Sequence, residues 1–138
     1  GITADVCSAT SFNMLRKEGM EKERFNELNP TAKQKKTYVE ECLPSSDIPV
    51  IAATDYMRAY PEQIRGFIKA PYYTLGTDGY GRSDSRQKLR EFFEVDANNI
   101  ARMAIYSLFR KGDISKKEIT SFYKKLKVDP SKPNPWEV

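Results

Sequence analysis

Short, continuously apolar stretches alternate along this chain with longer stretches in which apolar residues recur at helical spacing. The apolar stretches cover Ala4–Ala9, Pro49–Thr54 and Tyr72–Leu75, and they predict three strands. A strand without polar alternation is typical of a sheet that is covered on both faces. Because helical patterns separate these strands, we expect an α/β domain with three layers, in which helices cover both faces of the sheet.

Residues that favour helix ends bound the helical patterns. Pro61 suits the start of a helix, Gly112 suits a helix end, and Ser115 with Glu118 forms a capping-box pattern. Three prolines follow within residues 129–138, so we expect a domain over residues 1–128 and an extended, proline-rich tail over residues 129–138. The expected helices run from Phe12 to a stop at Gly19, more weakly from Met20 to Leu28, from Thr37 to Leu43, from Pro61 to about Ile68, from Ser85 to Phe93, from Asp96 to Gly112 and from Ser115 to Leu126.

The composition is that of one globular domain. The chain has 138 residues, of which 39% are hydrophobic and 30% charged, and this balance is enough to form a core. Part of the net charge of +4 comes from the basic stretch between Arg110 and Lys127, which raises the possibility of a nucleic-acid surface. However, Phe109, Phe122 and Leu126 fall at helical spacing there, which favours a core-facing helix with a lysine-rich solvated face. We therefore expect no nucleic-acid partner.

Several classes of site are excluded by what the sequence lacks. It contains no histidine, so Ser–His and Cys–His dyads and histidine metal sites are ruled out. Carboxylates, lysine, tyrosine or cysteine would have to carry any catalysis by this chain alone, and no pair of them stands out. Cys7 and Cys42 make no metal site by themselves, and we expect both thiols to be free and buried.

The expected location follows from two further patterns. No apolar run approaches the roughly 20 residues that a membrane-spanning helix needs. No signal-peptide pattern is visible at the N-terminus. We therefore expect a cytoplasmic protein without membrane contact.

The most informative stretch is the glycine-rich loop GTDGYGRSDSR, residues 76–86. It follows a predicted strand and precedes a predicted helix, and in α/β sheets function gathers at the carboxyl ends of strands. We expect Gly79 or Gly81 to have a positive φ, which glycine tolerates best, and Ser83 to cap the following helix. A phosphate-binding loop is only weakly indicated, because the Walker lysine is missing and the spacing is not G-x-G-x-x-G. A plain connecting loop therefore remains the alternative.

Three blocks of sequence together resemble a known family. The block GTDGYGRSDSRQKLREFFEVD, residues 76–96, is similar to the C-terminal domain of the homodimeric, bacterial type of pyruvate dehydrogenase, in the transketolase C-terminal-like superfamily. Residues 1–12 resemble an earlier strand region of that domain, and residues 53–65 resemble its next strand and helix. The resemblance implies a mixed sheet in a three-layer α/β/α fold, and it implies that this chain lacks the first strand or strands and the first helix.

That resemblance also implies a particular sheet order. The missing strand would lie between Ala4–Ala9 and the strand at residues 50–54, so the three strands of this chain would not form one continuous sheet. We expect the isolated chain to close this gap by self-association, because exposed strand edges recruit other chains; local rearrangement, or pairing with residues that precede Gly1, are the alternatives.

The resemblance implies a function for the parent enzyme rather than for this chain. Such enzymes use thiamine diphosphate and Mg²⁺ to decarboxylate pyruvate oxidatively, and they acetylate the lipoyl group of the dihydrolipoyl acetyltransferase component. The cofactor and catalytic motifs of the family lie in other domains, so no catalytic, cofactor-binding or metal-binding residue is carried over here. We expect a structural and dimerisation domain that is inactive alone, with the remaining domains, a second subunit and the acetyltransferase as partners.

The glycine-rich loop is the candidate interface. Its proposed contact residues are Gly79, Tyr80, Gly81, Arg82 and Asp84. Tyr80 and Arg82 are the residue types that anchor interfaces, although local packing of both remains an alternative. Two other functions also remain open. The chain could be a stand-alone module that binds an anion or another ligand, or it could be the C-terminal domain of another enzyme of the transketolase superfamily.

Overall fold

A computed structural model describes residues 2–138, and Gly1, the first residue of the N-terminal block that carries the family resemblance, lies outside them. Two strands pair in parallel near the middle of the fold, with Val50 opposite Tyr72 and Ala53 opposite Leu75. The elements are α1 (Phe12–Leu28), α2 (Tyr38–Cys42), β1 (Val50–Ala53), α3 (Ala59–Glu62), the 3-10 helix η1 (Arg65–Phe67), β2 (Tyr72–Leu75), α4 (Arg86–Phe92), α5 (Ala97–Lys111), α6 (Lys116–Lys125) and the 3-10 helix η2 (Pro135–Glu137).

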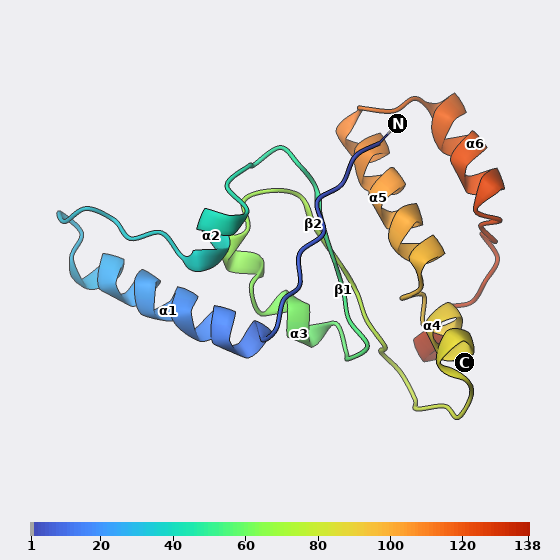
Figure 1. Ribbon diagram of the computed structural model, residues 1–138, viewed down its shortest axis with the longest axis horizontal. Coiled ribbons are helices and arrows are strands. Elements are labelled where there is room, and N and C mark those ends of the chain that lie inside the picture. The colour runs from blue at the N-terminus through green and yellow to red at the C-terminus, as the bar shows by residue number, and fades with distance from the viewer. Residues whose placement is uncertain (1) are drawn as a thin grey trace.

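Helices cover both faces of this strand pair, which confirms the expected three layers. Figure 1 shows α1, α2 and α3 on one side of β1 and β2, and α4, α5 and α6 on the other. Val50 and Ala52 pack against a cluster that includes Phe67 on the first side. Ile51 packs against a cluster that includes Phe93 on the second. Successive residues of a strand point to opposite faces, so β1 contributes to two separate cores.

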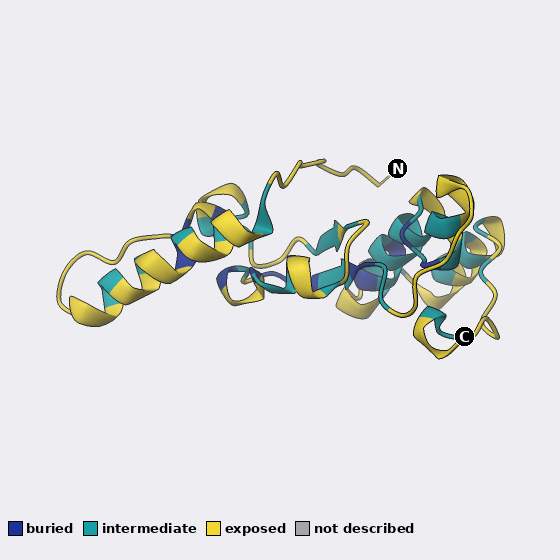
Figure 2. Ribbon diagram, turned by 90° about the horizontal axis from the view of Figure 1, so that it is seen from below, coloured by how far each residue is buried: buried dark blue, intermediate teal, exposed yellow. Residues whose placement is uncertain are grey.

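The prediction of a strand at Ala4–Ala9 is wrong. Residues 2–9 form neither helix nor strand, they are exposed throughout (Figure 2), and Val6 exposes 95% of its surface. A strand needs a neighbour that pairs its N–H and C=O groups, and the sheet of the described residues consists of β1 and β2. The expected burial of the two thiols is also wrong, since both Cys7 and Cys42 are exposed.

One helix replaces the two that were expected between Phe12 and Leu28. Gly19 lies inside α1 and is buried, and a Cβ placed on it would lie 2.4 Å from ring carbons of Phe67. The glycine therefore permits close packing against η1 instead of ending the helix. Ser11 caps α1, because its hydroxyl accepts a hydrogen bond from the N–H of Met14 at 3.2 Å.

The expected helix from Pro61 to Ile68 is divided into α3 and η1. Gly66 has a low helix propensity and lies inside the predicted span, and Pro61 occupies the third residue of α3 rather than the first. The predicted cap of α4 is also corrected. Ser85, directly before the helix, accepts from the N–H of Lys88 at 3.4 Å, whereas Ser83 lies too early in the chain to cap it.

The C-terminal helices agree with the prediction because local caps define them. Asp96 caps α5, and Gly112 ends it in the left-handed conformation with a φ of 94°. Ser115 and Glu118 form the expected capping box of α6. Residues 130 and 131 form a turn and residues 135–137 form η2, and the tail packs against the glycine-rich loop and the end of α4. None of the helices within residues 2–138 is long and apolar enough to cross a membrane.

Candidate functional site at the carboxyl ends of the strands

The two strands end at the same edge of the sheet, and the loops that follow them are joined by hydrogen bonds. The N–H of Thr54 donates to the carbonyl of Leu75 at 3.1 Å. Further along, the N–H of Thr77 donates to the carbonyl of Tyr56 at 2.9 Å, and the Thr77 hydroxyl donates to the carbonyl of Asp55 at 2.9 Å. The first residues of the glycine-rich loop are therefore held against the loop after β1.

Gly76 is the point of closest approach between these two loops. A Cβ at this position would lie 2.6 Å from the backbone nitrogen of Arg58 and 2.7 Å from the carbonyl oxygen of Tyr56. Both are backbone atoms, which cannot move aside as a side chain can. Only glycine fits this contact without displacing a loop.

Asp78 also joins the glycine-rich loop to the loop after β1. Its Oδ1 accepts a hydrogen bond from the N–H of Arg58 at 3.1 Å. Its Oδ2 lies 3.2 Å from Nε of Arg58, although that Nε–H is not directed at the carboxylate closely enough to form a hydrogen bond. The side-chain contact is therefore an ion pair, and the contact with the backbone N–H is a hydrogen bond.

The prediction of a positive φ in the loop is confirmed for Gly79, which has a φ of 108°. A Cβ there would also lie 2.9 Å from the Cα of Trp136, so the C-terminal tail packs directly on this glycine. Gly81 does not share these constraints, since its φ is not positive and nothing lies within 4 Å of its Cβ position. Two of the three glycines in the loop are therefore required by the geometry.

The remaining candidate residues of the loop do not converge on a common ligand position. Tyr80 exposes 82% of its surface. Arg82 packs locally, with its guanidinium 4.1 Å from the centroid of the Phe92 ring. Asp84 accepts a hydrogen bond from the N–H of its neighbour Ser85 at 2.6 Å. Among these three residues, Tyr80 is the large hydrophobic side chain that is left exposed.

One ion pair joins the loop after β1 to α4, and another lies between α3 and η1. Arg90 of α4 donates to both carboxylate oxygens of Asp55, at 3.0 and 2.6 Å, and this contact lowers the pKa of Asp55. On the other side, Arg65 donates to Glu62 at 2.7 Å, and this hydrogen bond is the main reason that the pKa of Glu62 is lowered. Both carboxylates are therefore charged at neutral pH, and each already accepts hydrogen bonds from an arginine.

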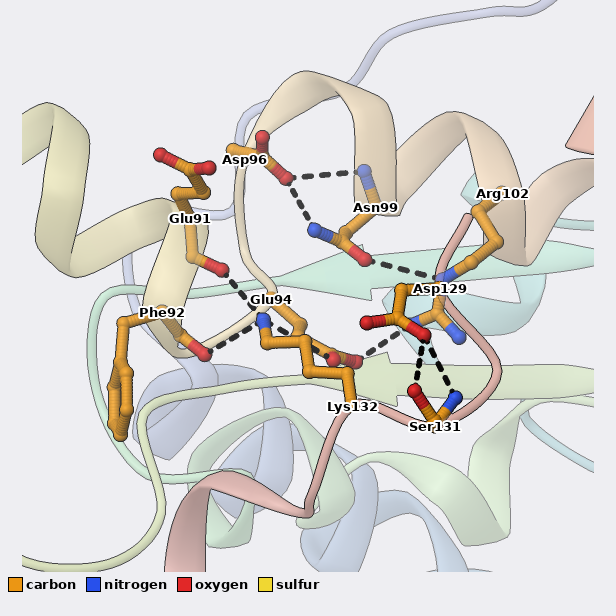
Figure 3. Close-up of polar contacts among 9 residues, drawn as sticks. All are labelled: Glu91, Phe92, Glu94, Asp96, Asn99, Arg102, Asp129, Ser131 and Lys132. Atoms are coloured by element: carbon orange, nitrogen blue, oxygen red, sulfur yellow. Dashed lines mark hydrogen bonds and ion pairs between the residues drawn. The ribbon is translucent and has the colours of Figure 1, made fainter. Parts of the chain in front are cut away.

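A second polar cluster holds the C-terminal tail against α4 and α5 (Figure 3). Lys132 donates to the carbonyls of Glu91 and Phe92 at the end of α4, at 2.9 and 3.2 Å. It also pairs with Glu94 at 3.3 Å, and Arg102 donates to Glu94 at 2.7 Å. Glu94 is itself in the left-handed region, with a φ of 60°. Cations near the last carbonyls of a helix are stabilising, so we interpret the cluster as a clamp on the tail.

Sequence reasoning missed this clamp and the packing of Trp136. Both join residues that are far apart along the chain, and no local motif marks them. Within the described residues, no group of three or more His, Cys, Asp or Glu side chains could hold a metal ion. The candidate site is therefore a pair of loops at the carboxyl ends of β1 and β2, held together by hydrogen bonds and carrying the exposed Tyr80.

Comparisons with known proteins identify the family. Residues 1–96 match the family model described as the transketolase-like TK C-terminal domain. The chain belongs to this family. As a transketolase-like C-terminal domain it has the α/β fold that the resemblance implied, here with helices on both faces of a small parallel sheet.

Relatives of this transketolase-like domain extend the match to the whole chain. The chain is 52% identical to the pyruvate dehydrogenase E1 component of Pseudomonas aeruginosa over 136 residues, or 98% of the chain. It is 46% identical to that of Cupriavidus necator over 138 residues, or 100% of the chain, and 41% identical to that of Escherichia coli K12 over 136 residues, or 98% of the chain. The chain spans 15% of the length of each of these relatives. The resemblance to pyruvate dehydrogenase is confirmed.

Proposed function

We propose that this chain is a structural, non-catalytic domain of a pyruvate dehydrogenase E1 component. The observation that carries the proposal is the similarity of at least 98% of the chain to such components, at 41–52% identity in the three relatives named above. The similarity extends beyond residue 96, where the match to the family model ends, through the C-terminal tail. It therefore supports the same structural role for residues 97–138 as for residues 1–96.

The parent enzyme would decarboxylate pyruvate oxidatively with thiamine diphosphate and Mg²⁺. It would pass the acetyl group to the lipoyl group of the dihydrolipoyl acetyltransferase component, as a homodimer in the cytoplasm. We assign the cofactors and the catalytic residues to the other domains of the parent. Two carboxylates at the loop edge, Asp55 and Asp78, are already engaged by Arg90 and Arg58, which supports a structural use of this edge.

Within this role, we propose that the tip of the glycine-rich loop, residues 79–84, contacts the second subunit. Tyr80 is the anchor, because it is exposed and lies on a loop whose base is fixed by Gly76 and Asp78. Fixing the base lowers the ordering cost that an interface must otherwise meet. Arg82 and Asp84 would support the contact from their local positions.

Activity measurements test the assignment to the parent enzyme. The full-length parent protein should oxidise pyruvate when supplied with thiamine diphosphate, Mg²⁺ and the remaining components of the complex, and the isolated 138-residue chain should show no activity above background. An inactive parent would contradict the assignment, and an active isolated chain would contradict the non-catalytic role. Thermal stabilisation of the isolated chain by phosphate, pyruvate or thiamine diphosphate would favour the alternative of a ligand-binding module.

The subunit contact is tested in the same full-length protein. We expect Tyr80→Ala to weaken the dimer, measured as a rise in the dissociation constant by sedimentation. Tyr38→Ala is the matched control, because Tyr38 is another exposed tyrosine, 56% exposed, on α2. Equal dissociation constants for the two variants would exclude Tyr80 as an anchor.

A further inference from the structure

The C-terminal tail, residues 129–138, lies on the surface of the domain. It runs from the end of α6 back to α4, where the chain ends (Figure 1). Within residues 2–138, the two clusters of buried residues and the side chains packed against them include no residue of the tail. Because the core does not depend on the tail, the tail can detach while the rest of the domain stays folded.

A single side chain provides the polar attachment of the tail. The amine of Lys132 donates to the carbonyls of Glu91 and Phe92 at 2.9 and 3.2 Å, and it lies 3.3 Å from the carboxylate of Glu94 (Figure 3). Among the described residues, every hydrogen bond and ion pair that joins the tail to the rest of the chain comes from this amine. The tail is therefore held at one point that depends on one positive charge.

The end of the tail covers the turn of the glycine-rich loop. A Cβ at Gly79 would lie 2.9 Å from the Cα of Trp136 and 3.2 Å from the carbonyl oxygen of Pro135. The guanidinium of Arg58 lies 5.1 Å from the centroid of the Trp136 ring. Gly79 has a φ of 108° and directly precedes the exposed Tyr80. The tail thus restrains the residue at which the loop turns toward its tip.

The contact between the tail and the loops carries a cost. Oδ1 of Asn134 in the tail and Nε of Arg58 in the loop after β1 are buried, and neither has a hydrogen-bond partner among residues 2–138. A buried polar atom without a partner is destabilising, and detachment of the tail would return both atoms to water. Trp136 still exposes 46% of its surface in the attached state, so the apolar gain from attachment is incomplete. The attached and detached states of the tail are therefore close in free energy.

We propose that the tail is a releasable strap, which fixes the conformation of the glycine-rich loop while the Lys132 amine holds it in place. Loss of that amine or of its charge opens the strap and leaves the tip of the loop, residues 79–84, free to move. The inference rests on the proposed function in one respect, since the strap then regulates the subunit contact at Tyr80. A loop that is no longer fixed must be ordered when the dimer forms, and this ordering weakens association.

Hydrogen exchange in the full-length parent protein, followed by mass spectrometry, tests the strap. Lys132→Met removes the amine and keeps most of the side-chain length. We expect the amides of residues 76–84 and of the tail to exchange severalfold faster in this variant, including the N–H of Thr77, which donates to a carbonyl of the loop after β1. Lys132→Arg keeps a charged donor and should preserve slow exchange. Lys124→Met is the matched control, because Lys124 is an exposed lysine on α6, and it should leave both segments unchanged.

A truncated variant opens the strap without touching Lys132. It lacks residues 133–138, and its loop should exchange as fast as the loop of Lys132→Met. The amides of α5 report on the fold in the same measurement and should keep their rate in both variants, so that one variant still tests the strap if the other unfolds. Unchanged loop exchange in a folded variant of either kind would overturn the proposal, as would a Lys132→Arg variant that behaves like Lys132→Met.

The dissociation constant of the dimer, measured by sedimentation on the same proteins, separates the strap from the proposed subunit contact. We expect Lys132→Met to raise this constant severalfold, and to raise it little further when Tyr80→Ala is already present, because both changes act through the same loop tip. Faster loop exchange with an unchanged dissociation constant would count against the subunit contact and leave the strap in place. Unchanged loop exchange would overturn the strap, whatever the dissociation constant.

Discussion

The sharpest test of the loop edge is the substitution Gly76→Ala. The added Cβ would meet the backbone nitrogen of Arg58 at 2.6 Å and the carbonyl oxygen of Tyr56 at 2.7 Å, so one of the two loops has to move. Overpacking of this kind costs about 1–3 kcal/mol. Movement would also lengthen two hydrogen bonds that cross the contact, from Thr77 to Tyr56 and from Arg58 to Asp78, each worth about 1 kcal/mol.

We therefore expect Gly76→Ala to lower the free energy of unfolding by roughly 2–4 kcal/mol. The loop itself offers two comparisons. Gly79→Ala introduces a side chain at a φ of 108°, which costs about 1 kcal/mol or more. Gly81→Ala meets open space without a positive φ, so its effect should stay within about 0.5 kcal/mol.

Urea unfolding of the three variants measures these differences. Circular dichroism follows the helices, and the fluorescence of Trp136 follows the tail, since this is the single tryptophan of the chain. Comparable slopes with urea are needed before the midpoints are converted into free energies. If Gly76→Ala and Gly81→Ala have the same stability, the close approach of the two loops is not what requires glycine at position 76.

Three further predictions concern other parts of the domain. Gly19→Ala should destabilise the chain by roughly 1–2 kcal/mol, because the clash with the buried Phe67 ring at 2.4 Å outweighs a helix-propensity gain of about 1 kcal/mol. Lys127→Gly should raise the midpoint of thermal unfolding, because Lys127 has a φ of 52° and a left-handed non-glycine residue costs about 1–2 kcal/mol. Arg65 lowers the pKa of Glu62 below its ordinary value of 4.5, so the stability from this pair is present above that pH and is lost as the pH falls through the lowered pKa. Glu62→Gln should therefore flatten the loss of stability that urea titrations measure as the pH is lowered from about 5 to about 3.

Each of these has its own control. Gly66→Ala, where no atom lies within 4 Å of the Cβ position, should not reproduce the loss seen for Gly19→Ala; an equal loss would mean that the Phe67 contact is not the cause. Lys127→Ala should not raise the unfolding midpoint, and a gain equal to that of glycine would rule out strain relief. An unchanged acid dependence in Glu62→Gln would show that the pair contributes little to acid stability.

The parts of the fold that sequence predicted well are those decided within a few residues. Asp96, Gly112 and the Ser115–Glu118 capping box define the ends of α5 and α6 through hydrogen bonds to their own turns. The positive φ of Gly79 was also predictable, because a tight loop that follows a strand directly tends to pass through the left-handed region, where glycine carries no steric cost.

The errors arose where distant contacts decide the structure. Gly19 has the sequence appearance of a helix stop, yet the ring of Phe67 packs against it and α1 continues through it. The strand predicted at Ala4–Ala9 has suitable residues but no paired neighbour among the described residues, and pairing partners are not encoded locally. The contacts of Lys132 and Trp136 could not be predicted for the same reason. Lys132 binds the end of α4 and Trp136 packs on Gly79, and both partners lie far away in the sequence, where no spacing rule connects them.

The alternation of side chains along β1 has a consequence for cooperativity. One cluster of buried residues consists of Val39, Ile64, Phe67 and Tyr72, and the other of Leu75, Phe93 and Val95. The short strand pair lies between the two clusters and contributes side chains to both. Each half therefore has a largely separate hydrophobic interior, and the coupling between the halves depends on how firmly β1 and β2 stay paired. Where that pairing is weakened, the two halves should unfold at different denaturant concentrations, and a single all-or-none transition would give way to two.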